Sequence, residues 1–193
     1  MVSGLRNRLE FHCFCSVAAQ YTVAGSHRIG RIYGKVLYRE FTDETFTQEI
    51  PHPLHLGLLG PVIKGEVGDI IKVHFKNMAS RPYTMHPHGV FYDKGSEGAL
   101  YDDHTTGDLK GDDYVQPNMS RVYEWSIPEN HAPTKDDENC LMWAYHSHVK
   151  PEEDINTGLI GKYHLIKSTR ERKNSKKHNI KKYRLFAFNM ELI

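Results

Sequence analysis

Apolar and polar residues alternate in short stretches along most of this chain. Arg31 to Phe41 and Ile70 to Asn77 follow a two-residue period and are rich in β-branched and aromatic residues, which is typical of half-buried strands. Similar stretches span residues 83–92, 121–127, 141–149 and 158–166. Gly, Pro, Asp and Asn separate them, and no segment carries a long apolar stripe at helical spacing. The pattern predicts an all-β fold, either a sandwich or a small barrel.

The length of the chain limits it to one full hydrophobic core. It has 193 residues, of which 39% are hydrophobic, and this suits a single domain, which we place at residues 31–166. Residues 1–30 are interpreted as a shortened N-terminal strand region or a weak signal-like segment. Their apolar run FHCFCSVAA follows two arginines, but it is short and interrupted by polar residues, so a signal peptide is doubtful.

Positive charge gathers near the C-terminus. Residues 167–184 hold nine Lys and Arg against Glu171, although the whole chain has a formal net charge of +1. We interpret residues 167–182 as a basic, solvated linker, because the run lacks the interleaved aromatics of a nucleic-acid or lipid site. Residues 183–193 begin with the strand-like YRLFAF and are expected to open a second, truncated domain. No nucleic-acid partner is predicted, and no stretch of the chain is apolar enough to cross a membrane.

The chain holds 13 histidines, and four of them form two triplets, His86-Pro87-His88 and His146-Ser147-His148. Residues i and i+2 of a strand point to the same face, roughly 6.5 Å apart. If the two strands are neighbours, about 4.8 Å apart, four imidazoles meet on one patch that suits a metal ion or a bridged pair of ions. One isolated pair is equally well explained as exposed strand histidines, whereas two matching pairs favour a metal site. Imidazole binds copper, zinc, iron and nickel, so the residues leave the metal open.

Pro87 restricts where the first triplet lies. Proline cannot donate a backbone hydrogen bond within a sheet, so it is confined to edge strands, strand ends and bulges. We therefore expect the His86 triplet at a sheet margin, where a neighbouring domain could add further ligands.

Two segments that include these triplets resemble a known family. HLGLLGPVIKGEVGDIIKVHFKNMASRPYTMHPHGVFYDKGSEGALYDD and CLMWAYHSHVKPEEDINTGLIG are similar to the first cupredoxin (plastocyanin-like) domain of the ceruloplasmin and hephaestin multicopper ferroxidases, with the hephaestin branch nearer. The resemblance covers roughly residues 35–166. It implies a Greek-key cupredoxin sandwich or barrel and, for the complete protein, iron(II) oxidation coupled to oxygen reduction, with roles in iron transport and a secreted or membrane-associated location.

The resemblance also implies which copper each histidine holds. In that family a three-copper cluster lies between the first and last domains, and each domain gives four histidines. His86 would hold the type 2 copper, His88 and His146 one type 3 copper, and His148 the other type 3 copper. A second cupredoxin domain must supply the remaining four histidines. The isolated chain is therefore expected to be inactive, and no catalytic residue is assigned to it.

Two further features follow from the same resemblance. Lys94, Leu109, Asp112 and Asp113 match a calcium site in which two carbonyls and two consecutive aspartates are the ligands, and such oxygens suit calcium. Cys140 matches a cysteine whose partner position holds Ile166 here, which implies an unpaired thiol. The other cysteines, Cys13 and Cys15, do not complete a disulfide framework.

Two other functions stay open at this stage. Coagulation factors V and VIII have similar domains that act as non-enzymatic interaction modules, but their triplets are degraded, whereas both are intact here. The same imidazoles could also bind zinc. For a copper site built from unperturbed histidines, we expect metal release between roughly pH 6 and pH 5, because protons compete for the ring nitrogens.

Overall fold

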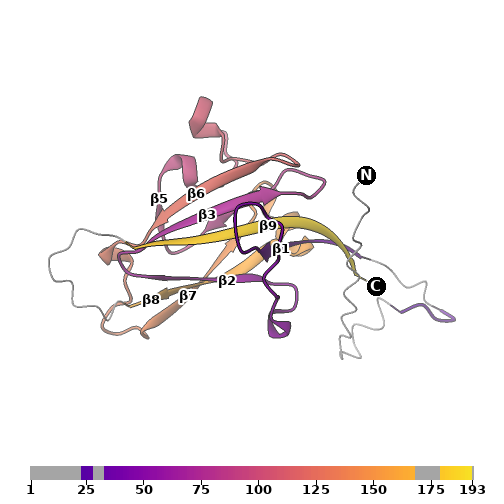
Figure 1. Ribbon diagram of the computed structural model, residues 1–193, viewed down its shortest axis with the longest axis horizontal. Coiled ribbons are helices and arrows are strands. Elements are labelled where there is room, and N and C mark those ends of the chain that lie inside the picture. Colours follow the sequence, from indigo (N-terminus) through magenta and orange to yellow (C-terminus); the bar gives the residue numbers. More distant parts are fainter. Residues whose placement is uncertain (1–22, 28–32, 168–178, 193) are drawn as a thin grey trace.

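The structure is a computed structural model that describes residues 23–27, 33–167 and 179–192 (Figure 1). Two β-sheets pack face to face, with β3, β6 and β9 on one side of the core and β2, β7 and β8 on the other. The predicted all-β sandwich is therefore confirmed, and it is consistent with a cupredoxin-like fold. None of the helices in the described residues is long and apolar enough to span a membrane.

The first sheet has five strands in the order β1-β9-β3-β6-β5. Their bounds are Tyr33–Glu40 for β1, Ile180–Leu192 for β9, Ile70–Asn77 for β3, Ser120–Ser126 for β6 and Phe91–Tyr92 for β5. The second sheet has the order β2-β8-β7-β4. Its strands are Gly60–Glu66 for β2, Ile160–Ile166 for β8, Cys140–His146 for β7 and His86–Pro87 for β4.

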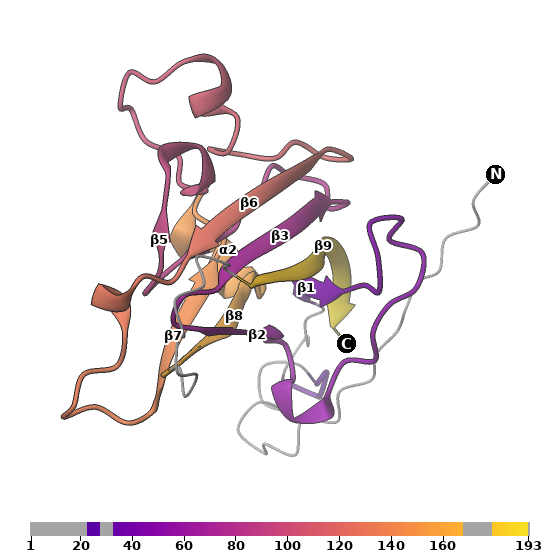
Figure 2. The ribbon, with the colours of Figure 1, turned by 60° about the vertical axis from the view of Figure 1, so that its left-hand side comes forward.

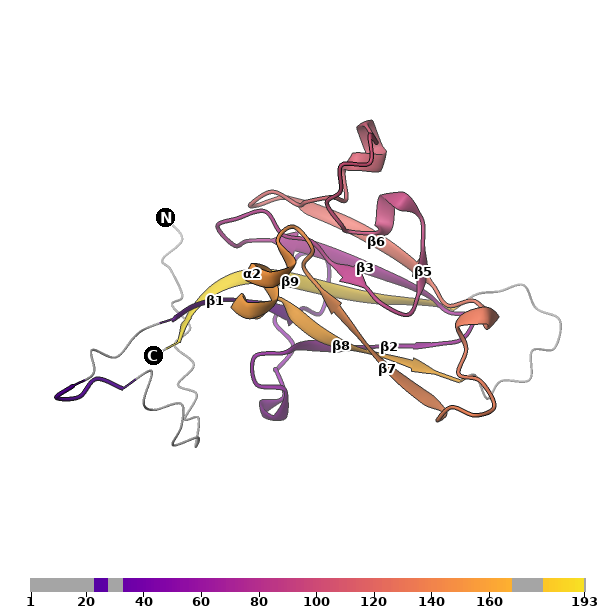
Figure 3. The same ribbon diagram turned by 180° about the vertical axis from the view of Figure 1, so that it is seen from behind.

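Five short helical segments lie among these strands in the described residues. The α-helix α2 covers Pro151–Thr157, and the 3-10 turns are η1 Leu54–Leu56, η2 Lys94–Ser96, η3 Gly107–Lys110 and η4 Glu129–His131. Figure 2 shows the segment between β5 and β6, which carries η2 and η3, projecting beyond the strands. Figure 3 shows α2 lying beside β1 and the end of β7.

Alternating burial places the core between the sheets. In β3 every second residue is buried, and in β8 the same alternation holds. Trp125 of β6 is fully buried in this core, as are most of its neighbours, and large aromatic rings contribute the greatest apolar area in a domain of this size. The core residues include Ile71, Val73, Phe75, Tyr123, Tyr163, Leu165, Leu185 and Ala187.

The C-terminal strand corrects one prediction. Residues 183–192 are indeed extended, but they belong to β9, which lies inside the first sheet, antiparallel to β1 and parallel to β3. They complete this domain rather than open a second one, because Leu185 and Ala187 are buried in its core. Of the predicted linker at 167–182, residues 168–178 lie outside the described part of the chain, and Ile180 to Lys182 belong to β9.

Other sequence predictions hold with smaller changes. The strands expected at residues 31–41, 70–77, 121–127, 141–149 and 158–166 correspond to β1, β3, β6, β7 and β8. The stretch at 83–92 is divided into β4 and β5, since Gly89 between them has a φ of 72°, a conformation that interrupts a strand. Strand β2 and helix α2 were not predicted. Most of the expected N-terminal segment, residues 1–30, lies outside the described residues.

Cys140 has no disulfide partner among the residues that the structure describes. It is exposed and free, and it lies directly opposite Ile166 across the β7–β8 ladder. A cysteine at that opposite position would be the natural partner, so the predicted unpaired thiol agrees with the register of these strands.

Candidate metal centre

The two histidine triplets lie on neighbouring strands. β4 and β7 are antiparallel, and His86 stands directly opposite His146. β4 is the outermost strand of its sheet. Pro87, which has no N–H to donate to a neighbouring strand, therefore lies at the sheet margin, as predicted. His88 and His148 follow the ends of β4 and β7 rather than lying inside these strands. The triplets therefore begin in the sheet and continue into the loops at its edge.

The four rings form one cluster, which we call the histidine quartet: His86, His88, His146 and His148. The ring centroids of His86 lie 5.1 Å from His88, 5.5 Å from His146 and 4.9 Å from His148. Those of His146 lie 5.1 Å from His88 and 5.6 Å from His148. All these separations are close enough for ring nitrogens to share bound ions.

The closest approach within the quartet is between His88 and His146. Their Nε2 atoms are 3.0 Å apart. Without a metal, one ring donates a hydrogen bond to the other. Metal–nitrogen bonds of about 2.0–2.1 Å, the length known for zinc, put two ligands at right angles roughly 2.9 Å apart. The observed separation therefore also fits two imidazoles on one ion.

Tyr145 sets the direction of His146. The Tyr145 ring is fully buried, its hydroxyl donates to the Pro61 carbonyl at 2.7 Å, and it fills the space beside Gly60 and Gly161. A side chain on either glycine would overlap the Tyr145 ring. Because successive strand residues face opposite sides, an inward Tyr145 places His146 on the outer face, toward β4.

Ser147 fixes the loop between the two histidines of the second triplet. Its hydroxyl donates to Oδ2 of the buried Asp154 at 2.7 Å and accepts the Thr84 N–H at 3.1 Å. The Thr84 hydroxyl in turn accepts the His148 N–H at 2.9 Å. The middle residue of the triplet thus faces inward and anchors the backbone, while its neighbours face the quartet.

Backbone carbonyls determine the tautomers of two rings. Nδ1 of His86 lies 2.7 Å from the Glu97 carbonyl, and Nδ1 of His146 lies 2.9 Å from the Ser147 carbonyl. A carbonyl can only accept, so Nδ1 carries the proton in both neutral rings and Nε2 keeps a lone pair for a ligand. Nδ1 of His148 is buried without a hydrogen-bond partner, and a bound ion would satisfy it.

Burial keeps these rings neutral. It lowers the pKa of His86 from 6.5 to about 4, and the neighbouring imidazoles add to this effect while the bond to Glu97 opposes it. Burial is also the main cause that lowers the pKa of His88 and of His146. Neutral imidazole is the form that binds metals. Copper release should therefore occur at lower pH than unperturbed histidines predict.

The stability of the metal-free chain should depend on His86 between pH 6.5 and about 4. In this range the unfolded chain binds a proton at His86 and the folded chain does not, so stability is complete above pH 6.5 and falls as the pH drops. The shift of the His86 pKa from 6.5 to about 4 corresponds to about 3 kcal/mol.

Urea unfolding at pH 7.5 and pH 4.5, in a metal chelator, measures this loss of stability. His86→Gln, which cannot titrate, should lose clearly less stability between the two values than the wild type. An identical pH dependence in both proteins would contradict the predicted role of His86.

The quartet gives few ligands to any one ion. Within the described residues, no three His, Cys, Asp or Glu side chains are arranged to hold one metal ion together. The rings instead offer nitrogens singly or in pairs, such as His88 with His146. Such an arrangement suits a multinuclear site that is completed by ligands from elsewhere.

The four residues predicted to bind calcium all lie in the projecting segment between β5 and β6. Lys94 begins η2 and Leu109 lies in η3. Arg121 draws these turns together, since its Nη2 donates to the carbonyls of Gly95 at 2.8 Å and Asp108 at 3.5 Å.

Asp112 and Asp113 are buried next to each other below these turns. Both are fully buried, and Oδ1 of each has no hydrogen-bond partner. Burial is the main cause that raises the pKa of Asp112, the hydrogen bond from the Gly98 N–H opposes it, and the charge of Asp113 adds to it. Lys110 pairs with Oδ2 of Asp113 at 2.8 Å. Two neighbouring buried carboxylates with oxygens left unpartnered suit a bound cation.

Several residues around the quartet were not predicted from the sequence. The rings of Tyr92 and Tyr101 lie 5.8 Å from His86 and 5.4 Å from His148, respectively, and they cover part of the site. Glu97 contributes a backbone carbonyl, for which any residue type would serve. The supporting contacts of Ser147 likewise depend on a helix, α2, that the sequence pattern did not indicate.

Comparisons with known proteins identify a family and several relatives. A family described as multicopper oxidase matches residues 56–170. The chain is 58% identical over 146 residues to hephaestin of Mus musculus, covering 76% of this chain and 13% of that protein. It is 54% identical over 145 residues to ferroxidase HEPHL1 of Homo sapiens, covering 75% of this chain and 12% of that protein. It is 46% identical over 158 residues to ceruloplasmin of Homo sapiens, covering 82% of this chain and 15% of that protein. The chain thus spans a small part of the length of each relative.

Proposed function

This chain belongs to the multicopper oxidase family, and on that basis we propose that it is a copper-binding domain of a ferroxidase-type enzyme. The single observation that carries the proposal is the histidine quartet, in which the Nε2 atoms of His88 and His146 lie 3.0 Å apart. The similarity to relatives named hephaestin and ferroxidase HEPHL1 supports iron(II) and oxygen as the substrates of the complete protein. The same resemblance implies an extracellular or membrane-associated setting.

We assign the quartet to three ions. His86 would hold the type 2 copper, His88 and His146 together one type 3 copper, and His148 the other type 3 copper. The short His88–His146 contact supports their sharing an ion, and the unpartnered Nδ1 of His148 supports a ligand at that ring. When bound, the copper ions would supply the electrons that reduce oxygen.

The chain's own residues hold and shield this site. The Nδ1 contacts to Glu97 and Ser147 leave Nε2 of His86 and of His146 unprotonated. Tyr92 and Tyr101 cover His86 and His148, and both His86 and His146 are buried. Exclusion of water keeps the imidazoles neutral and strengthens their attraction to a cation.

The quartet is half of a cluster in this proposal. A second cupredoxin domain would face β4, the outermost strand of its sheet, and supply the other four histidines. Electrons would come from a type 1 copper in another part of the complete protein. The domain by itself holds ligands but lacks both the remaining ligands and the electron source.

The isolated, copper-loaded chain should therefore not couple iron(II) oxidation to oxygen reduction. An oxygen electrode measures consumption after iron(II) is added, and the rate should match that of the chain treated with a copper chelator. Sustained oxygen consumption above this background would refute the proposal that the domain depends on a partner.

We further propose that Lys94 and Leu109, through their carbonyls, and Asp112 and Asp113, through their carboxylates, bind calcium. The unpartnered Oδ1 atoms of the two buried aspartates support this assignment. The site accepts oxygen ligands from a loop, and calcium tolerates such irregular geometry better than magnesium.

Calcium should raise the melting temperature of the chain. At a concentration about 100 times its dissociation constant, calcium contributes about 2.7 kcal/mol, which is roughly 5–10 °C for a domain of this size. Differential scanning calorimetry measures the shift. Asp113→Asn should abolish it, whereas Asp102→Asn, a change at a fully exposed side chain, should leave it intact. A shift that survives in Asp113→Asn would contradict the assignment.

A further inference from the structure

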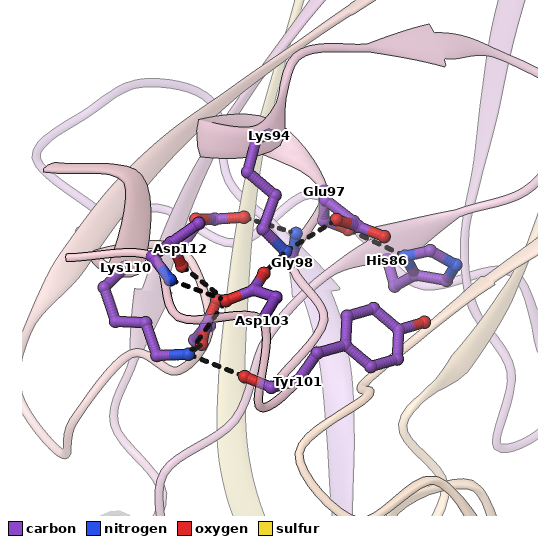
Figure 4. Close-up of polar contacts among 10 residues, drawn as sticks. His86, Lys94, Glu97, Gly98, Tyr101, Asp103, Lys110 and Asp112 are labelled. Carbon is purple, nitrogen blue, oxygen red and sulfur yellow. Dashed lines mark hydrogen bonds and ion pairs between the residues drawn. The ribbon is translucent and has the colours of Figure 1, made fainter.

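A single peptide group lies between the histidine quartet and the buried aspartates. The carbonyl of Glu97 accepts the Nδ1–H of His86 at 2.7 Å, and the N–H of Gly98 donates to Oδ2 of Asp112 at 2.8 Å (Figure 4). These are the two ends of the same peptide bond. Asp112, the peptide and His86 thus form one chain of hydrogen bonds.

The charge of Asp112, at one end of this chain of hydrogen bonds, affects His86 at the other end. A carboxylate that accepts the Gly98 N–H polarises the peptide group and makes the Glu97 carbonyl a stronger acceptor. A stronger acceptor at Nδ1 favours the tautomer with the proton on Nδ1. Nε2 of His86 then carries the lone pair, and its basicity rises, as in carboxylate–histidine–metal arrangements.

The position of the peptide is fixed by close packing. Gly98 has a φ of 66°, and a Cβ atom at this position would overlap the carbonyl of Met85, the residue before His86. The backbones of Gly98 and Met85 are therefore in close contact, and this contact fixes the peptide beside His86.

The segment is also held from outside. Lys94 pairs with Glu97 at 2.8 Å and with Asp103 at 2.6 Å, and Lys110 donates to the Tyr101 carbonyl at 2.6 Å (Figure 4). These contacts keep the Glu97–Gly98 peptide from turning away from His86.

We propose that Asp112 is a positioning residue for His86, acting through the Glu97–Gly98 peptide to set the tautomer and direction of the imidazole. The aspartate pair and the histidine quartet are then coupled parts of one site, rather than separate sites on one domain. This proposal deepens the copper function and rests on it for its purpose, although the hydrogen-bond chain itself needs no metal.

The tautomer of His86 tests the proposal in the absence of metal. Nitrogen-15 NMR of the histidine-labelled chain, in chelators for copper and calcium, should find the proton of His86 on Nδ1. In Asp112→Asn, which keeps the shape and removes the charge, the His86 nitrogen resonances should move toward a mixture of tautomers. Asp102→Asn removes a charge from a fully exposed side chain outside this chain of hydrogen bonds, so it should leave His86 unchanged.

Copper affinity gives a second readout. Loss of such a supporting contact lowers metal affinity by roughly 10–100-fold, so Asp112→Asn should weaken copper binding to that extent and Asp102→Asn, at a fully exposed side chain, should not. If Asp112→Asn folds poorly, Gly98→Ala serves as the second variant. It displaces the Glu97–Gly98 peptide and keeps both aspartates, so it should weaken copper binding to the same extent.

Three results would overturn the positioning role. These are a wild-type His86 protonated at Nε2, a His86 spectrum unchanged in both Asp112→Asn and Gly98→Ala, or an equal change in Asp102→Asn. A failure of the proposed copper function gives a different result. The wild-type chain would then bind no copper, while the His86 nitrogen resonances would still change in Asp112→Asn.

Discussion

A chain that ends at Asn179 should fail to fold. Such a chain lacks β9, which is hydrogen-bonded to β1 on one side and to β3 on the other. Its loss would separate β1 from the sheet, expose the edge of β3 and remove Leu185 and Ala187 from the core. The lost hydrogen bonds on both sides of β9, together with the lost core side chains, should exceed the roughly 5–15 kcal/mol by which small domains are stable. Circular dichroism and amide NMR spectra should show an unfolded chain.

Point variants separate this prediction from a general effect of truncation. Leu185→Ala removes one fully buried side chain and should cost roughly 2–5 kcal/mol in urea unfolding. Lys182→Ala changes an exposed residue on the same strand and should alter stability by less than about 0.5 kcal/mol. If the chain ending at Asn179 folds with an intact sheet, β9 is not an integral strand of this domain.

Replacing His88 and His146 together by alanine should remove most of the copper binding. These residues approach most closely within the quartet, at 3.0 Å between Nε2 atoms, and the proposal gives them one ion to share. Loss of a supporting contact alone lowers metal affinity by roughly 10–100-fold, and loss of two direct ligands should exceed this. Copper titration followed by calorimetry and metal analysis measures the difference from the wild type.

The matched control is a double variant at histidines outside the quartet, His55→Ala with His104→Ala. Both residues are exposed, so the variant removes the same number of imidazoles without touching the site. It should bind copper as the wild type does. Equal losses in the two double variants would indicate nonspecific binding by surface histidines and would refute the assignment.

The sequence predicted the strands better than their arrangement. Alternation of apolar and polar residues matches the burial of β3 and β8, in which one face is buried and the other is not. β1 and β7 were identified as strands although their burial does not alternate. Alternation could not show that YRLFAF joins the first sheet, since β9 pairs in parallel with β3, a strand far away in the sequence. Helix α2, PEEDINT, was not predicted because it is only seven residues long and buries only Asp154, so it shows no apolar stripe at helical spacing.

The candidate site was likewise predicted only in part from the sequence. The two triplets are visible in the sequence because histidines two residues apart share a face of a strand. The proline rule also placed His86 correctly at the sheet margin. The peptide between His86 and Asp112 left no such signal, because its contacts come from backbone atoms that any residue carries. Gly98 is required there by a close approach that becomes evident once the chain is folded.

X-ray absorption at the copper edge of the loaded wild-type chain tests the central claim most directly. The histidine quartet predicts a first shell of nitrogen and oxygen atoms with the multiple scattering of imidazole rings, and no sulfur. A sulfur neighbour at roughly 2.3 Å would mean that copper binds at a cysteine, such as the exposed Cys140, instead. That result would contradict the assignment of the site to the four histidines.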